Sequence, residues 1–141
     1  MSSRREFIKG MAGATTALCC GVGMTTLLES CTSVAQLQVP IIDDSIKLDT
    51  SVFQDKNYVV IKNNRLPAPI YIHKENDTYK ASLMLCTHRQ CELNVTGITL
   101  TCPCHGAEFS NRGKLLQGPA ETDLQSLKLS ISDSTIIIDL T

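Results

Sequence analysis

The distribution of apolar residues beyond position 40 predicts a chain built from short β-strands. Apolar side chains alternate with polar ones or form short runs rich in valine and isoleucine. Polar residues, all but Glu75 being asparagine, aspartate or serine, separate these runs at 63–64, 75–77 and 132–134, where they favour turns. No helical period or internal repeat interrupts the pattern. The fold class is therefore all-β, with strands expected at 45–48, 58–62, 70–73, 78–83, 98–101, 127–131 and 135–140.

The first 40 residues have a different character. Residues 10–28 contain no charged side chain, and 32–39 are polar and aperiodic. An uncharged run of this length at an N-terminus is typical of a targeting or membrane segment, whereas a polar aperiodic stretch is typical of a linker. We therefore predict a signal or membrane anchor at 1–31, a tether at 32–40 and a folded domain at 41–141.

Composition limits the classes of function. The 141 residues suffice for one domain, and the formal net charge is −1. Beyond residue 30 the chain has ten basic and twelve acidic side chains, which gives no basis for nucleic-acid binding. There is no tryptophan, and only three phenylalanines and three tyrosines are present, so the core must be aliphatic. Because a small aliphatic core is marginal, a bound metal group or a disulfide is expected to contribute to stability.

Two short boxes contain four of the seven cysteines and two of the three histidines. They read Cys86-Thr87-His88-Arg89-Gln90-Cys91 and Cys102-Pro103-Cys104-His105-Gly106-Ala107. Thiolates and imidazoles are ligands for both iron and zinc. Zinc fingers usually separate their cysteines from their histidines, whereas each box here combines the two. A zinc-stabilised binding module is nevertheless the non-redox alternative.

The boxes resemble the signature of Rieske iron-sulfur proteins. The similarity extends from about residue 59 to 140 and includes Gly118-Pro119-Ala120, which resembles the proline loop that covers the cluster in the quinol-oxidising members. The resemblance implies a fold of stacked antiparallel sheets with two cluster-binding loops at one tip. It also implies a [2Fe-2S] cluster held by two thiolates and two imidazoles. The implied ligands are Cys86, His88, Cys102 and His105, and a disulfide between Cys91 and Cys104 is implied to join the loops.

The function implied by the resemblance is one-electron transfer, with His88 or His105 accepting a proton from a quinol. We expect a membrane-tethered subunit of a quinol:cytochrome oxidoreductase, similar to quinol–cytochrome c reductase. A quinol or a redox enzyme would be the electron donor, and a cytochrome-like protein would be the acceptor. The alternatives are the small Rieske subunit of a periplasmic oxidoreductase of the arsenite-oxidase type and a ferredoxin serving an oxygenase. Ferredoxins of that type generally lack the disulfide cysteines.

Some positions depart from the family pattern. Relatives of high potential carry a serine and a tyrosine where this chain has Ala107 and Phe109, so two hydroxyl donors near the cluster are missing. Arg89 replaces the usual leucine beside the first histidine. The reduction potential is therefore expected below the upper end of the Rieske range. His73, the third histidine, is expected on the solvated surface and not among the ligands.

The segment Ser3-Arg4-Arg5-Glu6-Phe7-Ile8-Lys9 resembles a twin-arginine export signal. This route carries folded proteins, which suits a cofactor inserted before export, and it implies the outer face of the bacterial cytoplasmic membrane. Leu27-Leu28-Glu29-Ser30-Cys31 resembles a lipobox except at Glu29. The sequence leaves open whether the N-terminus is a transmembrane anchor, is lipidated at Cys31 or is cleaved.

Overall fold

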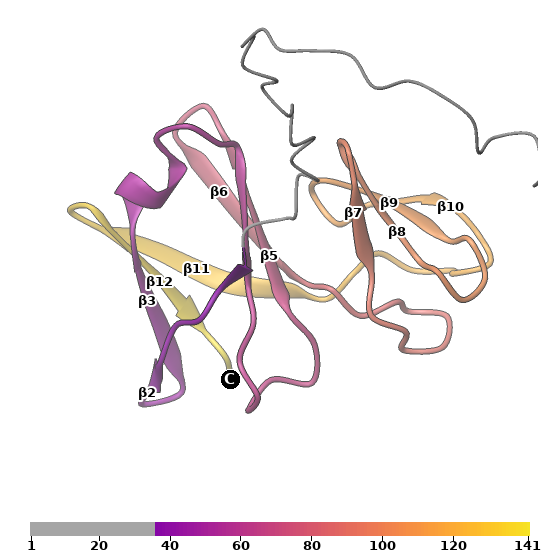
Figure 1. Ribbon diagram of the computed structural model, residues 1–141, viewed down its shortest axis with the longest axis horizontal. Helices are drawn as coiled ribbons and strands as arrows, with labels where there is room; N and C mark the ends of the chain where they lie inside the picture. The colour runs from indigo at the N-terminus through magenta and orange to yellow at the C-terminus, as the bar shows by residue number, and fades with distance from the viewer. Residues whose placement is uncertain (1–35) are drawn as a thin grey trace, which may run out of the picture. The chain divides into compact units, whose positions relative to one another are not determined.

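The structure is a computed structural model that describes residues 36–141 (Figure 1). The predicted export signal, Cys31 and the first part of the predicted tether lie outside the described residues. The regular secondary structure of the described part is β apart from one short 3-10 helix, which confirms the predicted fold class. Its strands are β1 (Gln36–Leu37), β2 (Ile41–Ile42), β3 (Ser45–Asp49), β4 (Tyr58–Ile61), β5 (Ile70–Glu75), β6 (Thr78–Leu83), β7 (Asn94–Thr96), β8 (Thr99–Thr101), β9 (Glu108–Ser110), β10 (Leu115–Gln117), β11 (Ser126–Ser132) and β12 (Thr135–Asp139).

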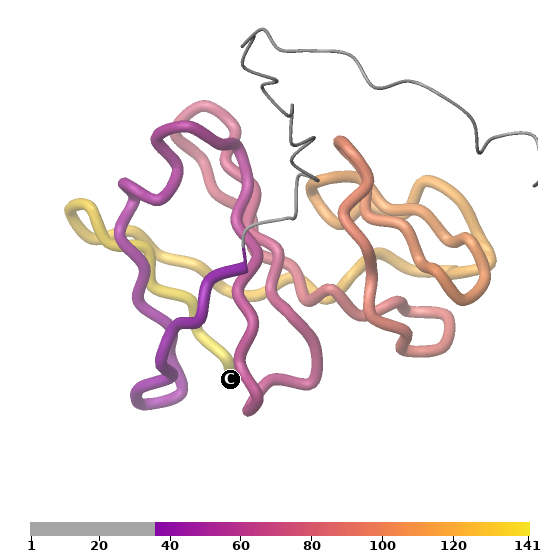
Figure 2. Tube along the Cα trace, viewed as in Figure 1, coloured from indigo at the N-terminus to yellow at the C-terminus, as the bar shows by residue number. Residues whose placement is uncertain are grey.

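The strands form two sheets. The larger sheet has the order β1-β4-β5-β6-β11-β12-β3-β2, and the smaller has the order β10-β9-β8-β7. Strands β6 and β11 are hydrogen-bonded neighbours, with Leu127 paired to Ala81, although more than 40 residues separate them. The chain trace shows that the intervening segment leaves the larger sheet, forms the smaller sheet and returns (Figure 2). The smaller sheet and its loops are therefore an insertion between two adjacent strands.

Strand β4 and the first half of β5 are buried on both faces, which explains their nearly continuous apolar sequences. Val59 and Ile72 belong to an aliphatic core within the larger sheet. Val60 and Tyr71 point the other way, into a second core shared with the inserted segment. Because successive side chains of a strand face opposite sides, the same two strands support both cores. The second core, called here the site-side core, consists of Val60, Tyr71, Met84, Cys86, Leu93, Leu100, Cys102, Ala107, Phe109, Ala120 and Leu124.

Each of the seven predicted strands has a counterpart in the structure. The range 78–83 matches β6, and the other predicted ranges overlap their strands with ends shifted by one or two residues. The hairpin between β5 and β6 turns at Asn76, whose φ is +52°, a left-handed value that asparagine tolerates. The short strands β1, β2, β7, β9 and β10 were not expected. A 3-10 turn at Thr50–Phe53 was also not expected; the Asp49 carboxylate accepts from the Ser51 N–H at 2.8 Å and caps it.

The N-terminal end of the described region is attached to the sheet. Gln36 and Leu37, within the predicted tether, pair in parallel with Val60 and Ile61. No helix within residues 36–141 is long and apolar enough to cross a membrane.

Candidate metal centre

Two loops of the inserted segment have the same backbone hydrogen bonds. In the first loop, the Cys86 N–H donates to the Cys91 carbonyl at 2.9 Å, and the Gln90 N–H donates to the Cys86 carbonyl at 2.7 Å. The second loop repeats both bonds, with Cys102 in the place of Cys86, at 2.8 and 3.0 Å. Each loop thus turns back on its first cysteine within six residues. We call residues 86–91 loop 1 and residues 102–107 loop 2.

The equivalence of the two loops extends to backbone conformation. The fifth residue of each loop has a left-handed φ, +56° at Gln90 and +74° at Gly106. Glycine adopts this conformation at no steric cost, whereas residues with a Cβ atom adopt it at a cost in stability. Loop 1 therefore contains a local strain that loop 2 avoids.

The first cysteine of each loop is a buried free thiol. Cys86 and Cys102 are 1% and 2% exposed, and they are the cysteines without a disulfide in the described part of the chain. Burial raises the pKa of Cys86, partly offset by backbone N–H groups of His88 and Arg89 that donate to its sulfur. Burial acts in the same direction at Cys102, but N–H groups from the residues at positions 104 and 105, together with the Cys86 thiol, outweigh it and lower the pKa.

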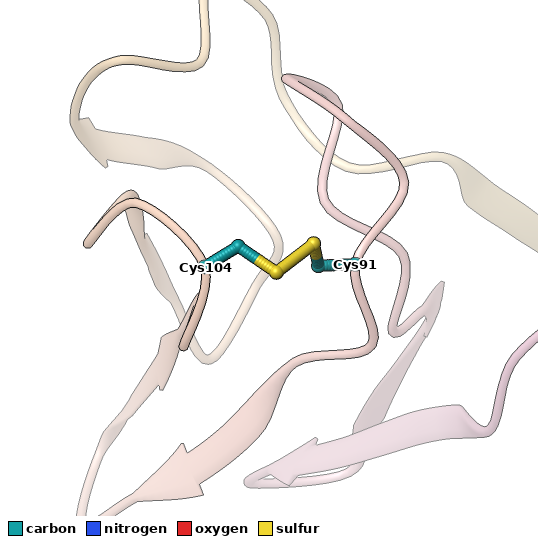
Figure 3. The surroundings of a disulfide bond; sticks show 2 residues. All are labelled: Cys91 and Cys104. Carbon is teal, nitrogen blue, oxygen red and sulfur yellow. A yellow bond between two sulfur atoms is a disulfide. The ribbon is translucent and has the colours of Figure 1, made fainter.

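A disulfide joins the two loops (Figure 3). Cys91 and Cys104 are bonded, with Cα atoms 6.5 Å apart, as the resemblance implied. Their sulfurs lie within 4.8 Å of one another and of the Cys102 sulfur. Because a disulfide sulfur offers no thiolate, this trio is not itself a metal site. Its effect is to hold the two loops side by side next to one free thiol.

The histidines of the two boxes lie next to each other. The rings of His88 and His105 have centroids 4.9 Å apart and meet edge to face, at 83°. His105 is exposed and His88 is half-buried. The Nδ1 atom of His88 is shielded from solvent and has no hydrogen-bond partner among the described residues. Such an orphaned nitrogen is costly unless it has a ligand.

These residues fit a [2Fe-2S] group of the Rieske type. Two adjacent thiols receive backbone N–H groups that stabilise thiolates, which are the form that ligates iron. Two neighbouring imidazoles complete a donor set of two sulfurs and two nitrogens, one of them the unpartnered Nδ1 of His88. Loops 1 and 2 thus contain all four residues that the sequence predicted as ligands, one cysteine and one histidine in each.

A third loop lies against both of these loops. We call residues 115–122 the Pro119 loop. Its Gln117 side chain donates from Nε2 to the Gly106 carbonyl at 3.2 Å, and its Thr122 carbonyl accepts from the Thr87 hydroxyl at 2.8 Å. Beside His88 the Pro119 loop borders a cavity of about 310 Å³. The cavity is lined by Thr87, His88, Pro119, Glu121 and Thr122. The Thr87 and Gln117 contacts had no signal in the sequence, because each joins loops whose proximity depends on the fold.

The two positions that lack hydroxyl donors are both fully buried. Ala107 and Phe109 are 0% exposed and belong to the site-side core together with Cys86 and Cys102. Any hydroxyl placed there would be shielded from water and would have to find its partner inside the protein.

His73 is not the solvated histidine that we expected. It is half-buried, its Nδ1 atom is shielded, and its Nε2 atom lies 3.1 Å from Nδ2 of Asn111 in the turn between β9 and β10. Burial lowers its pKa, and the positive charge of Arg112 lowers it further. The expectation of a solvated ring is therefore wrong, because a distant turn packs over this strand.

Comparison with known proteins agrees with this geometry. Residues 44–128 match the Rieske [2Fe-2S] domain family. The chloroplast cytochrome b6-f complex iron-sulfur subunit of Triticum aestivum is 31% identical over 74 residues, covering 49% of this chain and 33% of the relative. The cytochrome b6-f complex iron-sulfur subunit of Chlorobaculum tepidum is 33% identical over 58 residues, 40% of this chain and 32% of that subunit. The match thus spans about a third of the length of these relatives.

A solved structure supports the same relationship. The fold is similar to that of the cyanobacterial plasma membrane Rieske protein PetC3 from Synechocystis PCC 6803, with a TM-score of 0.54 and 27% sequence identity. The similarity covers 64% of this chain and 94% of that protein.

Proposed function

Because this chain belongs to the Rieske [2Fe-2S] domain family, we propose that Cys86, His88, Cys102 and His105 bind its cluster. The observation that carries the proposal is the pair of equivalent loops. They bring two buried free thiols into contact and set two imidazole rings 4.9 Å apart. When bound, a cluster with this ligand set supplies one-electron transfer at a potential above that of an all-cysteine cluster.

The chain's own residues fit an exchange of electrons at the surface. The thiols are on the buried side of the site, whereas His105 is exposed and His88 borders the cavity next to the Pro119 loop. A donor can therefore approach the imidazoles without opening the fold. We assign His88 and His105 the role of contacting that donor and of accepting its proton.

We further propose that the protein is the electron-transfer subunit of a membrane-bound quinol:cytochrome oxidoreductase. Two of the relatives described above are iron-sulfur subunits of cytochrome b6-f complexes, and the structural relative is a plasma membrane protein. The disulfide between Cys91 and Cys104 favours this branch over oxygenase ferredoxins. Export by the twin-arginine route, and anchoring through residues 10–28 or a lipid on Cys31, place the domain on the outer face of the bacterial cytoplasmic membrane in this proposal.

The first test is the metal content of the purified full chain. We expect two irons and two acid-labile sulfides per chain, and zinc without sulfide would overturn the proposal. The His105→Ala variant should lose the cluster, because half of the imidazole coordination is removed. A water-soluble quinol should then reduce the wild-type cluster under anaerobic conditions. A loaded protein that is reduced by dithionite but not by quinol would contradict the quinol assignment and leave the cluster assignment standing.

A further inference from the structure

We propose that Asp123 is a positioning residue for the metal centre, because its carboxylate fixes the Pro119 loop across loops 1 and 2. Asp123 directly follows the loop, whereas Lys114 directly precedes it. Asp123 Oδ2 accepts from Lys114 Nζ at 2.7 Å, and Asp123 Oδ1 accepts from the Leu115 N–H at 2.9 Å. Both carboxylate oxygens thus join the two ends of the loop. The consequence for iron retention rests on the proposed function, but the contacts themselves do not.

The base of the Pro119 loop is fixed against the larger sheet. The Leu124 N–H donates to the Gly113 carbonyl at 2.8 Å, next to the Asp123 contacts. Gly113 has a φ of +76°, and a Cβ atom there would lie 2.7 Å from the Ser82 hydroxyl oxygen of β6. Such a close approach leaves the turn little freedom to move relative to β6. The turn that Asp123 contacts therefore has a fixed position relative to β6.

The middle of the Pro119 loop contacts both loops of the metal centre. Its contact from Gln117 reaches loop 2 next to His105, and its contact with Thr87 reaches loop 1 next to His88. Between them Ala120 is 6% exposed and packs in the site-side core. The loop therefore covers part of the site and forms one wall of the cavity beside His88. Releasing its base should loosen this cover without removing any candidate ligand.

The two contacts of Asp123 should differ in weight. The side chains of Lys114 and Asp123 are 72% and 45% exposed, and ion pairs of this kind contribute little because water screens them. The bond to the Leu115 N–H is charge-assisted and fixes a backbone position within the loop. Because water competes for this partly exposed carboxylate, we take the bond to have ordinary net strength, and its loss then changes the population of a locally open state about fivefold. Removing the carboxylate should thus matter more than removing Lys114.

Four variants of the full chain separate these contacts. Asp123→Ala removes both, Asp123→Asn keeps an oxygen for the Leu115 N–H, and Lys114→Met removes the ion pair alone. Glu75→Gln is the matched control. Glu75 forms an ion pair with Arg112, which lies in the same turn as Lys114, but this pair joins the turn to β5 and not to the Pro119 loop. Two rates are measured under native conditions: amide hydrogen exchange of residues 113–124, and release of iron to a chelator.

We expect exchange and iron release to rise about fivefold in Asp123→Ala, by less than twofold in Asp123→Asn and Lys114→Met, and not at all in Glu75→Gln. Rescue by the asparagine variant would identify the Leu115 bond as the important contact. Unchanged exchange in Asp123→Ala would overturn the proposal, and so would faster exchange with unchanged iron release. If the wild type holds neither iron nor sulfide, the proposed function fails, while exchange alone still decides whether Asp123 fixes the loop.

Discussion

Replacing Gly106 with alanine should destabilise the domain by about 1 kcal/mol, almost entirely through backbone conformation. Its φ is +74°, and a Cβ atom added there meets no atom within 4 Å. The left-handed conformation costs an L-residue roughly 1–2 kcal/mol, and the stiffer unfolded chain of the alanine variant returns about 0.4–1 kcal/mol. The difference between this cost and this return, about 1 kcal/mol, is the expected loss in the free energy of unfolding.

Gly113 provides the steric comparison. Its φ of +76° is nearly the same, but an added Cβ would lie 2.7 Å from the Ser82 hydroxyl oxygen and 3.3 Å from Leu124 Cβ. Crowding in a packed region adds about 1–3 kcal/mol, so Gly113→Ala should cost roughly 2–4 kcal/mol in total. Gly97, at φ +61° with no neighbour within 4 Å, is the control outside loops 1 and 2.

Urea unfolding of the three variants with the cluster bound measures these differences. Gly97→Ala and Gly106→Ala should lower the free energy of unfolding by similar amounts, and Gly113→Ala by clearly more. Iron release to a chelator should increase in Gly106→Ala but not in Gly97→Ala, because only Gly106 lies in a loop of the metal centre. Equal costs at Gly106 and Gly113 would refute the reasoning, since they would mean that the close approach to Ser82 has no energetic weight.

Three further predictions concern the cross-link, the potential and acid stability. Replacing Cys91 and Cys104 together by serine should lower the free energy of unfolding of the cluster-free protein by about 3 kcal/mol, measured with urea, since the bond spans 13 residues. The loss should be smaller with the cluster bound, because the cluster also joins the two loops. Equal losses in both states would contradict this. Ala107→Ser and Phe109→Tyr should each raise the reduction potential, measured by protein-film voltammetry, by about 60–130 mV when the new hydroxyl donates to a sulfur. If neither variant raises the potential, the explanation by missing donors is wrong. The pKa of Asp123 lies below its ordinary 3.8 because Lys114 and the Leu115 N–H both donate to its carboxylate. The contribution of Asp123 to stability is therefore complete above pH 3.8 and is lost as the pH falls through the lower pKa of the folded protein. Hydrogen exchange of residues 113–124, corrected for its intrinsic rate, should accelerate on acidification in the wild type but not in Asp123→Asn.

The sequence was sufficient for the larger sheet because its signals are local. The run 78–83 has a clear boundary at Asn76-Asp77, and the left-handed φ of Asn76 makes that boundary a tight turn. The small sheet was largely missed for a physical reason. Strands β7, β9 and β10 have three residues each, too few for a periodic pattern, and the pairing of Leu100 with Phe109 depends on the position of loop 2 between β8 and β9.

The site divides in the same way. The candidate ligands lie at short spacing within each box, where the resemblance to the Rieske signature implied them. The contact of Thr87 with Thr122 spans 35 residues, and the contact of His73 with Asn111 spans 38. Such contacts exist only once the inserted segment has folded back onto the larger sheet. Side-chain chemistry was thus predictable, whereas the positioning of the Pro119 loop and the burial of His73 were not.

Apart from the contact between the two thiols themselves, the hydrogen bonds to the two free sulfurs come from the backbone. His88 and Arg89 donate their N–H groups to Cys86, and the residues at 104 and 105 donate theirs to Cys102. Any sequence that forms these loops supplies these donors, because the loop geometry directs the N–H groups inward. The absence of hydroxyls at Ala107 and Phe109 therefore leaves these backbone donors in place. It follows that the loops decide whether a cluster binds, while the buried positions beside them adjust how strongly it attracts an electron.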